Sequence, residues 1–189
     1  MYWQVLWFRT PRSNTAQLSA YHVMAEEIWQ QTSGRIDAFV QSTGTATSVR
    51  GVAEGLRRKR SDIRIVAVEP SESAVLSGGA TGVHRIEGVG AGFVVPLWHA
   101  GIADEIETVS TDEAIAMARR LARSEALFAG TSTGANIVAA IATGQRLGKG
   151  ATVVTVMCDG GSRRYCLNAS MISSARATLF ARLMRLSMR

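Results

Sequence analysis

Short apolar runs of strand length alternate with segments of helical spacing, and this alternation constrains the fold more than any other feature of the chain. Residues 36–40 and 63–68 predict buried strands, and a helix over about 47–59 separates them. A capping box at 110–113 begins another helix, and the valine-rich run 151–157 predicts a further strand. This order predicts an α/β fold, three layers with a mostly parallel sheet and helices on both faces.

The weaker segments fit the same scheme. A helix ends before Ser33, short strands are predicted near 106–109 and 127–129, and a helix follows 130–134. Residues 71–99 are rich in glycine and serine and weakly patterned. In a parallel sheet, the turns that follow the strands lie at the carboxyl edge, where ligands bind. The turns at 41–48, 129–134 and 158–162 are therefore expected at that edge.

The turn Gly44-Thr45-Ala46-Thr47-Ser48 stands between a predicted strand and a predicted helix. The first N–H groups of a helix have no internal acceptor, and the helix dipole makes that end partly positive. With three hydroxyl side chains as further donors, the turn predicts an anion site. An ordinary turn with a Ser or Thr N-cap explains the same residues, and it is the favoured interpretation when the turn is taken alone.

The net charge of +6 belongs to the end of the chain. Residues 1–159 carry equal numbers of basic and acidic side chains, and six arginines follow Asp159 without an acid. A basic tail can bind nucleic acid or an anionic membrane, but no nucleic-acid-binding motif accompanies it, so a solvated end is favoured. The chain also has no apolar run of membrane-spanning length and no signal-peptide pattern at its start.

Two cysteines, Cys158 and Cys166, are too few for a disulfide framework and favour a reducing, cytoplasmic location. Cys158 is expected to be a buried thiol at the end of a strand. His22, His84 and His99 lack metal-ligand spacing, so no metal site is predicted.

The serine at the centre of residues 130–134, Ser132, stands in a Gly-x-Ser-x-Gly pattern like that of a nucleophile elbow. A hydrolase of that type needs a histidine after the serine, and the last histidine is His99. The sequence therefore argues against a catalytic serine. The basic cluster 57–60 is expected to complement the negative end of a helix.

Several segments, in order, resemble the cysteine synthase family of pyridoxal-phosphate enzymes, within about residues 21–165. The matching stretches are AEEIWQQT (25–32), IDAFVQSTGTATSVRGV (36–52), IVAVEPSESAVLSGGATGVHRIEGVGAGF (65–93), STDEAIAMARRLARSEALFAGTSTGAN (110–136) and VVTVMCDGGSRRY (153–165). The resemblance implies the fold type II architecture of tryptophan synthase β, pyridoxal 5'-phosphate as cofactor, and β-replacement at an O-activated serine to give cysteine or an S-substituted cysteine.

The resemblance also implies a set of cofactor-binding residues. The family's Gly-Thr-Gly-Gly-Thr phosphate turn falls on residues 44–48, with Ala46 and Thr47 in place of glycines that allow close backbone approach. The family's cofactor-side glycine loop and pyridine-nitrogen hydroxyl fall on 88–91 and near 160–162. The implied residues are Gly44, Thr45, Ala46, Thr47, Ser48, Gly88, Gly90, Gly160 and Ser162.

The lysines depart from the family. Pyridoxal-phosphate chemistry uses a lysine amine to form a Schiff base and to move protons. This chain has two lysines, Lys59 and Lys149, and neither lies in a segment like the family's lysine motif, which is upstream of the matching region. We therefore expect no Schiff-base lysine and no activity from this chain alone. It resembles the C-terminal part of such an enzyme: a truncated product, a fragment or one subunit of a split protein.

The sequence thus divides into a poorly matched segment 1–20, a cofactor-binding α/β domain 21–166 and a basic amphipathic tail 167–189. The expected partners are a small amino-acid substrate and either a second copy or the missing N-terminal half, with no nucleic acid and no membrane. Cystathionine β-synthase and S-sulfocysteine synthase activities remain alternatives within the family. The alternative outside it is a non-catalytic module that binds a phosphate ligand or a protein partner.

Overall fold

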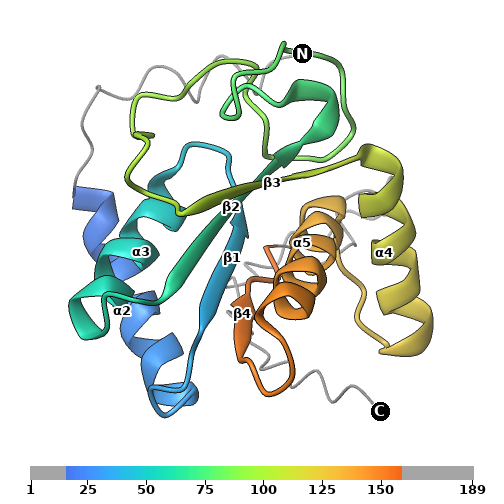
Figure 1. The fold of residues 1–189 in the computed structure, drawn as a ribbon. Coiled ribbons are helices and arrows are strands. Elements are labelled where there is room, and N and C mark those ends of the chain that lie inside the picture. Colours follow the sequence, from blue (N-terminus) through green and yellow to red (C-terminus); the bar gives the residue numbers. More distant parts are fainter. Residues whose placement is uncertain (1–15, 159–189) are drawn as a thin grey trace, which may run out of the picture.

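The computed structural model of this 189-residue chain describes residues 16–158, and its strands and helices alternate along the chain (Figure 1). In order, the elements are α2 (Ala16–Gln31), β1 (Ala38–Ser42), α3 (Thr47–Lys59), β2 (Arg64–Pro70), the short 3-10 helix η1 (Ser71–Ser73), β3 (Glu105–Val109), α4 (Thr111–Ser124), α5 (Thr131–Leu147) and β4 (Val153–Thr155).

The four described strands form one parallel sheet in the order β3-β2-β1-β4. At the start of β1, Ala38 lies opposite Arg64 on one side and Val153 on the other. Because the strands are parallel, their carboxyl ends meet at one edge, and the irregular segment between η1 and β3 lies over that edge (Figure 1). The predicted parallel α/β sheet is confirmed.

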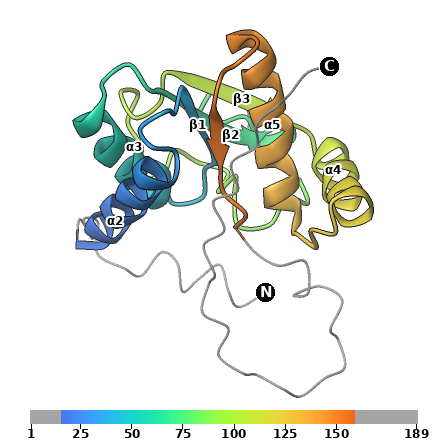
Figure 2. The same ribbon diagram turned by 90° about the horizontal axis from the view of Figure 1, so that it is seen from below.

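The two faces of the sheet are covered by different helix pairs. Phe39 of β1 points into a cluster with α2 and α3, whereas its neighbours Ala38 and Val40 point into a cluster with α4 and α5. This is the alternation expected of a strand buried on both faces. Both views show α2 and α3 on one side of the sheet and α4 and α5 on the other (Figures 1 and 2), so the predicted three layers are confirmed.

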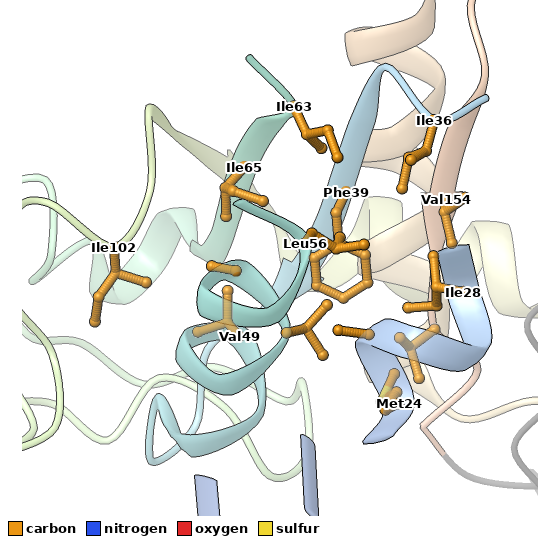
Figure 3. Packing of buried hydrophobic residues seen from close by; sticks show 14 of the residues in the cluster. Met24, Ile28, Ile36, Phe39, Val49, Leu56, Ile63, Ile65, Ile102 and Val154 are labelled. Atoms are coloured by element: carbon orange, nitrogen blue, oxygen red, sulfur yellow. The ribbon is translucent and has the colours of Figure 1, made fainter. Parts of the chain in front are cut away.

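The cluster beneath α2 and α3 is built around Phe39 (Figure 3). Phe39, Ile28 and Leu56 are each at most 1% exposed. Burial of side chains of this size contributes roughly 1.5–3 kcal/mol each. The labelled members of the cluster are Met24, Ile28, Ile36, Phe39, Val49, Leu56, Ile63, Ile65, Ile102 and Val154.

The predicted helix ends have identifiable causes. Helix α4 begins with the predicted capping box: the Glu113 N–H donates to the Ser110 hydroxyl, and the Ser110 N–H donates to the Glu113 carboxylate. At the end of α3, Arg57 donates to the carbonyls of Gly101 and Ile102. Arg57 of the basic cluster therefore holds the loop before β3 in place. Its positive charge also suits the negative end of the helix dipole.

The strand predicted over 151–157 is shorter in the structure, Val153–Thr155. Two other predicted strands also differ. The first begins at Ala38 rather than at residue 36, because the Asp37 carboxylate accepts a 2.7 Å hydrogen bond from the Thr152 N–H and so turns the chain into the sheet. Residues 127–129 form no strand, and only Ala129 makes a bridge. The reason is the end of α4: Ala126 has φ 52°, and the Leu127 N–H donates back to the Leu121 carbonyl.

Some predictions concern residues outside the described range. Of the predicted segments 1–20, 21–166 and 167–189, residues 1–15 and 159–189 lie outside it. The basic tail 167–189 lies wholly there. Within residues 16–158, no helix is both long enough and apolar enough to cross a membrane.

Candidate functional site at the carboxyl edge of the sheet

The turn between β1 and α3 leaves the start of α3 open. Its N-cap residue is Ala46, in the left-handed conformation at φ 65°, and it supplies no capping side chain. The N–H groups of Thr47, Ser48 and Val49 therefore have no acceptor within the helix. This disagrees with an ordinary turn closed by a Ser or Thr N-cap, and it leaves the positive end of α3 facing the carboxyl edge.

Hydroxyl groups surround this helix start. The Oγ1 atoms of Thr45 and Thr47 lie 2.9 Å apart, and the Gln41 amide donates to the Ser48 hydroxyl at 2.7 Å. Thr45, Thr47 and Ser48 of the predicted site are therefore brought together at the first turn of α3.

The methyl group of Ala46 does not stand free at the helix start as an obstacle to a ligand. It is 2% exposed and belongs to the apolar cluster beneath α2 and α3. The left-handed φ of Ala46 is a conformation that glycine adopts without strain, which agrees with its alignment to a glycine of the family's turn.

The glycine loop at residues 88–92 rests directly on this turn. The Gly90 N–H donates to the Thr43 carbonyl at 3.2 Å. A Cβ atom on Gly44 would lie 2.4 Å from the Gly88 carbonyl oxygen, so the approach of the two loops requires glycine at 44. The two glycine-containing segments that the sequence assigns to one site are thus adjacent in the structure.

A cavity of about 10 Å³ lies between these loops, room for roughly one water molecule. Thr43, Gly44, Ser73 and Gly90 are among the residues that line it. The hydroxyls of Thr43 and Ser73 are buried and have no hydrogen-bond partner among the described residues. A water molecule in this cavity would satisfy two polar groups that are otherwise costly to bury.

Glu69, at the end of β2, fixes the beginning of the segment that carries the glycine loop. It is 2% exposed, and its carboxylate accepts hydrogen bonds from the N–H groups of Leu76 and Ser77 and from the Ser77 hydroxyl. The sequence predicts no role for Glu69 in the site. Its partners lie in a weakly patterned segment, so the sequence carries no signal for this role.

The first turns of α5 hold other segments of the same edge. Asn136 accepts from the Ser42 N–H at 2.7 Å and donates to the Val156 carbonyl at 2.8 Å. Thr133 accepts from the Cys158 N–H at 3.2 Å. The sequence predicted that the turn 129–134 lies at this edge, but it gave no signal for the polar contacts of Thr133 and Asn136.

Both lysines lie at the opposite edge of the sheet. Lys59 ends α3, and twelve residues at about 1.5 Å each place it roughly 18 Å from the helix start. Its amine lies 2.6 Å from a Glu26 carboxylate oxygen. Lys149 stands in the turn before β4, whose first residue pairs with Ala38 at the start of β1. Neither amine is therefore near the open start of α3.

Three predicted residues that follow β4 in the sequence have different outcomes. Cys158 is exposed, which corrects the expectation of a buried thiol. The described strand ends at Thr155, so Cys158 lies three residues beyond the sheet. Gly160 and Ser162 lie outside the described residues.

These residues fit the phosphate of a phosphorylated cofactor. The helix start lacks a side-chain cap, two threonine hydroxyls lie 2.9 Å apart beside it, and the Ser48 hydroxyl lies in the first turn of the helix. Phosphate supplies acceptor oxygens and negative charge, which this set of donors and the helix dipole complement.

A family model described as "Pyridoxal-phosphate dependent enzyme" matches residues 6–159. The chain belongs to this family of pyridoxal-phosphate dependent enzymes. The cysteine synthases of Staphylococcus aureus strains Mu50 and N315 are each 46% identical to it over 138 residues, which is 72% of this chain and 44% of theirs. This finding confirms the resemblance to cysteine synthases and the dependence of the family on pyridoxal phosphate.

Solved structures agree with the sequence matches. O-acetyl serine sulfhydrylase isoform 3 from Entamoeba histolytica has a TM-score of 0.78 and 38% identity, covering 87% of this chain and 50% of that one. An O-ureido-L-serine synthase has a TM-score of 0.75 and 34% identity, covering 80% of this chain and 48% of that one. The chain thus has the fold type II architecture, and it spans about half the length of these relatives.

His22 lies apart from this site, whereas His84 contacts the backbone of the glycine loop. The His22 Nε2 lies 3.2 Å from a Glu54 carboxylate oxygen between α2 and α3, and the His84 Nε2 lies 3.1 Å from the Gly90 carbonyl oxygen. Within residues 16–158, no three His, Cys, Asp or Glu side chains form a group suited to a metal ion.

Proposed function

We propose that this chain supplies the phosphate-binding half of an enzyme that forms cysteine, or an S-substituted cysteine such as S-sulfocysteine, from an O-activated serine and a sulfur donor. The observation that carries the proposal is the uncapped start of α3 with Thr45 and Thr47 beside it. The 46% identity to cysteine synthases supports the reaction class.

In this proposal the chain binds pyridoxal 5'-phosphate by its phosphate. The N–H groups at the start of α3 donate to the phosphate oxygens, together with Thr45, Thr47 and Ser48, whose hydroxyl is held by Gln41. Gly88 and Gly90 form the wall beside the cofactor. When bound, the cofactor supplies the electron sink for β-replacement, and this chain supplies its position and excludes water from one side.

We further propose that the chain does not catalyse the reaction alone. Lys59 and Lys149 lie at the sheet edge opposite the open start of α3, so neither amine reaches a ligand held there. A lysine from a partner, either an N-terminal half of cysteine synthase type or another subunit in a homodimeric assembly, would complete the site. A cytoplasmic location, supported by the low cysteine count, belongs to the same proposal.

The first test compares pyridoxal 5'-phosphate with pyridoxal, which lacks the phosphate, in titrations of the 189-residue chain. We expect measurable binding of the phosphate ester and binding of pyridoxal weaker by at least about tenfold, because the donors of the site face the phosphate. Thr47→Val should weaken binding of the ester. Thr143→Val, at a buried threonine whose hydroxyl donates within α5, should leave it unchanged.

The second test concerns catalysis. The purified chain, given pyridoxal 5'-phosphate, O-acetylserine and sulfide, should form no cysteine above the rate without protein. Co-expression with the N-terminal half of the S. aureus cysteine synthase should restore cysteine formation. Cysteine formation by the chain alone would contradict the assignment of the lysine to a partner.

A non-catalytic binding module is the second candidate, and the position of both lysines away from the site favours it. It would bind a phosphate ligand or a protein partner through the same edge. Binding of the phosphate ester, with no activity in the presence of any N-terminal half, would support this candidate. The sulfur donor separates the enzyme alternatives, so sulfide, thiosulfate and homocysteine should be compared in the reconstituted assay.

A further inference from the structure

The segment Gly130-Thr131-Ser132-Thr133-Gly134, which resembles a nucleophile elbow in sequence, has a different use in the structure. It forms the N-cap and first turn of α5 and sends side-chain hydroxyls to neighbouring loops. Thr131 Oγ1 accepts from the Glu87 N–H at 3.2 Å, just before the glycine loop. Thr133 Oγ1 accepts from the Cys158 N–H at 3.2 Å, beyond β4.

Asn136, one turn further along α5, makes the most buried of these contacts. It is 0% exposed. Its Oδ1 accepts from the Ser42 N–H at 2.7 Å, and its Nδ2 donates to the Val156 carbonyl at 2.8 Å. Its Nδ2 also lies 3.5 Å from the Cys158 Sγ. One amide therefore joins the end of β1 to the chain that leaves β4.

The chemistry of these partners requires an amide side chain. The Ser42 N–H needs an acceptor and the Val156 carbonyl needs a donor, and the asparagine amide offers both in one plane. An apolar side chain would leave both backbone groups buried without partners, which is costly.

The position of Ser42 connects this contact to the phosphate turn. Ser42 is the last residue of β1, and the turn to α3 begins directly after it. The strand partners of β1 fix Ser42 along the ladder, with Val68 opposite, but β4 pairs with β1 only as far as Val40. On the β4 side, where the ladder ends, the Asn136 amide accepts the hydrogen bond from the Ser42 N–H.

We propose that Asn136 is a positioning residue of the phosphate site. Its amide fixes the end of β1 to the exit of β4 and so holds the turn 43–48 in its binding geometry. The proposal rests on the proposed function for the ligand, and on the hydrogen bonds of the described residues for the positioning. Misalignment of even one hydrogen bond to a charged phosphate can cost about tenfold in affinity, so loss of this amide should be measurable in ligand affinity.

The test uses the full 189-residue chain and three variants. Asn136→Ala removes the amide, and Asn136→Ser, whose hydroxyl cannot reach both partners, replaces it if the alanine variant does not fold. Thr143→Val is the matched control: Thr143 is buried in the same helix, and its hydroxyl donates to the Ala139 carbonyl, away from the turn.

Two measurements are made on each variant. Pyridoxal 5'-phosphate affinity should fall at least about tenfold in Asn136→Ala and stay within about twofold in Thr143→Val. Amide hydrogen exchange by NMR should show faster exchange at Ser42 than at the other β1 amides in Asn136→Ala alone. A general loss of stability would instead raise the exchange of all β1 amides together.

The outcomes separate this inference from the proposed function. Unchanged affinity in the folded Asn136 variants, or Ser42 exchange that follows the rest of β1, would overturn the positioning role. A wild-type chain that binds no pyridoxal 5'-phosphate would overturn the proposed function. The exchange at Ser42 would still decide whether Asn136 fixes the end of β1.

Discussion

Gly44 shows at the residue scale how closely the two loops of the site approach each other. The space that a side chain at this position would need is occupied by the Gly88 carbonyl oxygen, which lies 2.4 Å from the position of a Cβ atom. The family turn carries glycine at this position. From the sequence alone, the need for glycine could be explained by backbone conformation. The structure assigns it to the space that the neighbouring loop takes.

Gly44→Ala should therefore destabilise the chain by about 1–3 kcal/mol, because the loop at Gly88 must move and the hydrogen bond from Gly90 to Thr43 is strained. Gly101→Ala is the control, since a Cβ there would make only ordinary contacts with His99, and it should change stability by less than about 0.5 kcal/mol. Urea unfolding of both variants measures the difference. Equal effects would contradict the close approach of the loops.

At the element scale, the starts of the helices serve two different purposes. Helix α4 has a complete capping box, whereas α3 starts at Ala46 without a side-chain cap. An uncapped start forgoes about 0.5–2 kcal/mol of helix stability, and in exchange its donors remain available to a ligand. Helix α5 also starts without a side-chain cap, but there the hydroxyls of Thr131 and Thr133 accept hydrogen bonds from neighbouring segments.

Ser110→Ala should cost about 1 kcal/mol at pH 7, because it removes the acceptor of the Glu113 N–H and one partner of the Glu113 carboxylate. Ser124→Ala, at the other end of α4, removes only a hydroxyl that donates to the Arg120 carbonyl and should cost less than about 0.5 kcal/mol. Chemical unfolding at pH 7 distinguishes the two variants.

The same capping box should depend on pH. Hydrogen bonds from the Ser110 side chain, and then from its backbone, hold the pKa of Glu113 below its ordinary value of 4.5. A lowered pKa means that the carboxylate stabilises the folded chain above pH 4.5, and that this contribution is lost as the pH falls through the folded-state pKa. The stability difference between wild type and Ser110→Ala should therefore shrink between pH 7 and pH 3. A constant difference would contradict the role of the ionised carboxylate.

Helices α4 and α5 lie side by side (Figure 2). They approach each other closely at Gly134. A Cβ atom there would lie 2.0 Å from the Ala114 carbonyl oxygen. Gly134→Ala should destabilise the chain even though alanine is favoured over glycine in a helix by about 1 kcal/mol, because the helices must separate. Ala142→Gly in the same helix calibrates the propensity and should cost about 1 kcal/mol. A stabilising Gly134→Ala would show that the two helices are not in contact there.

At the scale of the whole molecule, the sequence predicts what depends on local patterns. Helix α3 has the predicted bounds, Thr47–Lys59, because apolar spacing defines its buried face and basic residues mark its end. The capping box of α4 and the parallel sheet were predictable for the same reason. A strand, a turn and a helix in order indicated an anion site at residues 44–48, but this pattern alone favoured an ordinary capped turn, and the phosphate assignment came from the family resemblance.

The sequence could not predict contacts that join distant segments. Asn136 binds Ser42, 94 residues away, and Val156, 20 residues away, and no local pattern pairs these residues. Residues 127–129 have strand composition, but the end of α4 takes their backbone into a turn. The exposure of Cys158 likewise depends on where β4 stops, which its apolar run does not show.

The placement of Lys59 and Lys149 at the amino edge of the sheet has a practical consequence. Reagents that couple to lysine side chains, such as fluorophore esters or activated biosensor surfaces, will attach on the side away from the start of α3. Both lysines are exposed, and the Lys59 amine is paired with Glu26. A chain immobilised or labelled through these side chains should therefore present the opposite edge freely to a partner in solution.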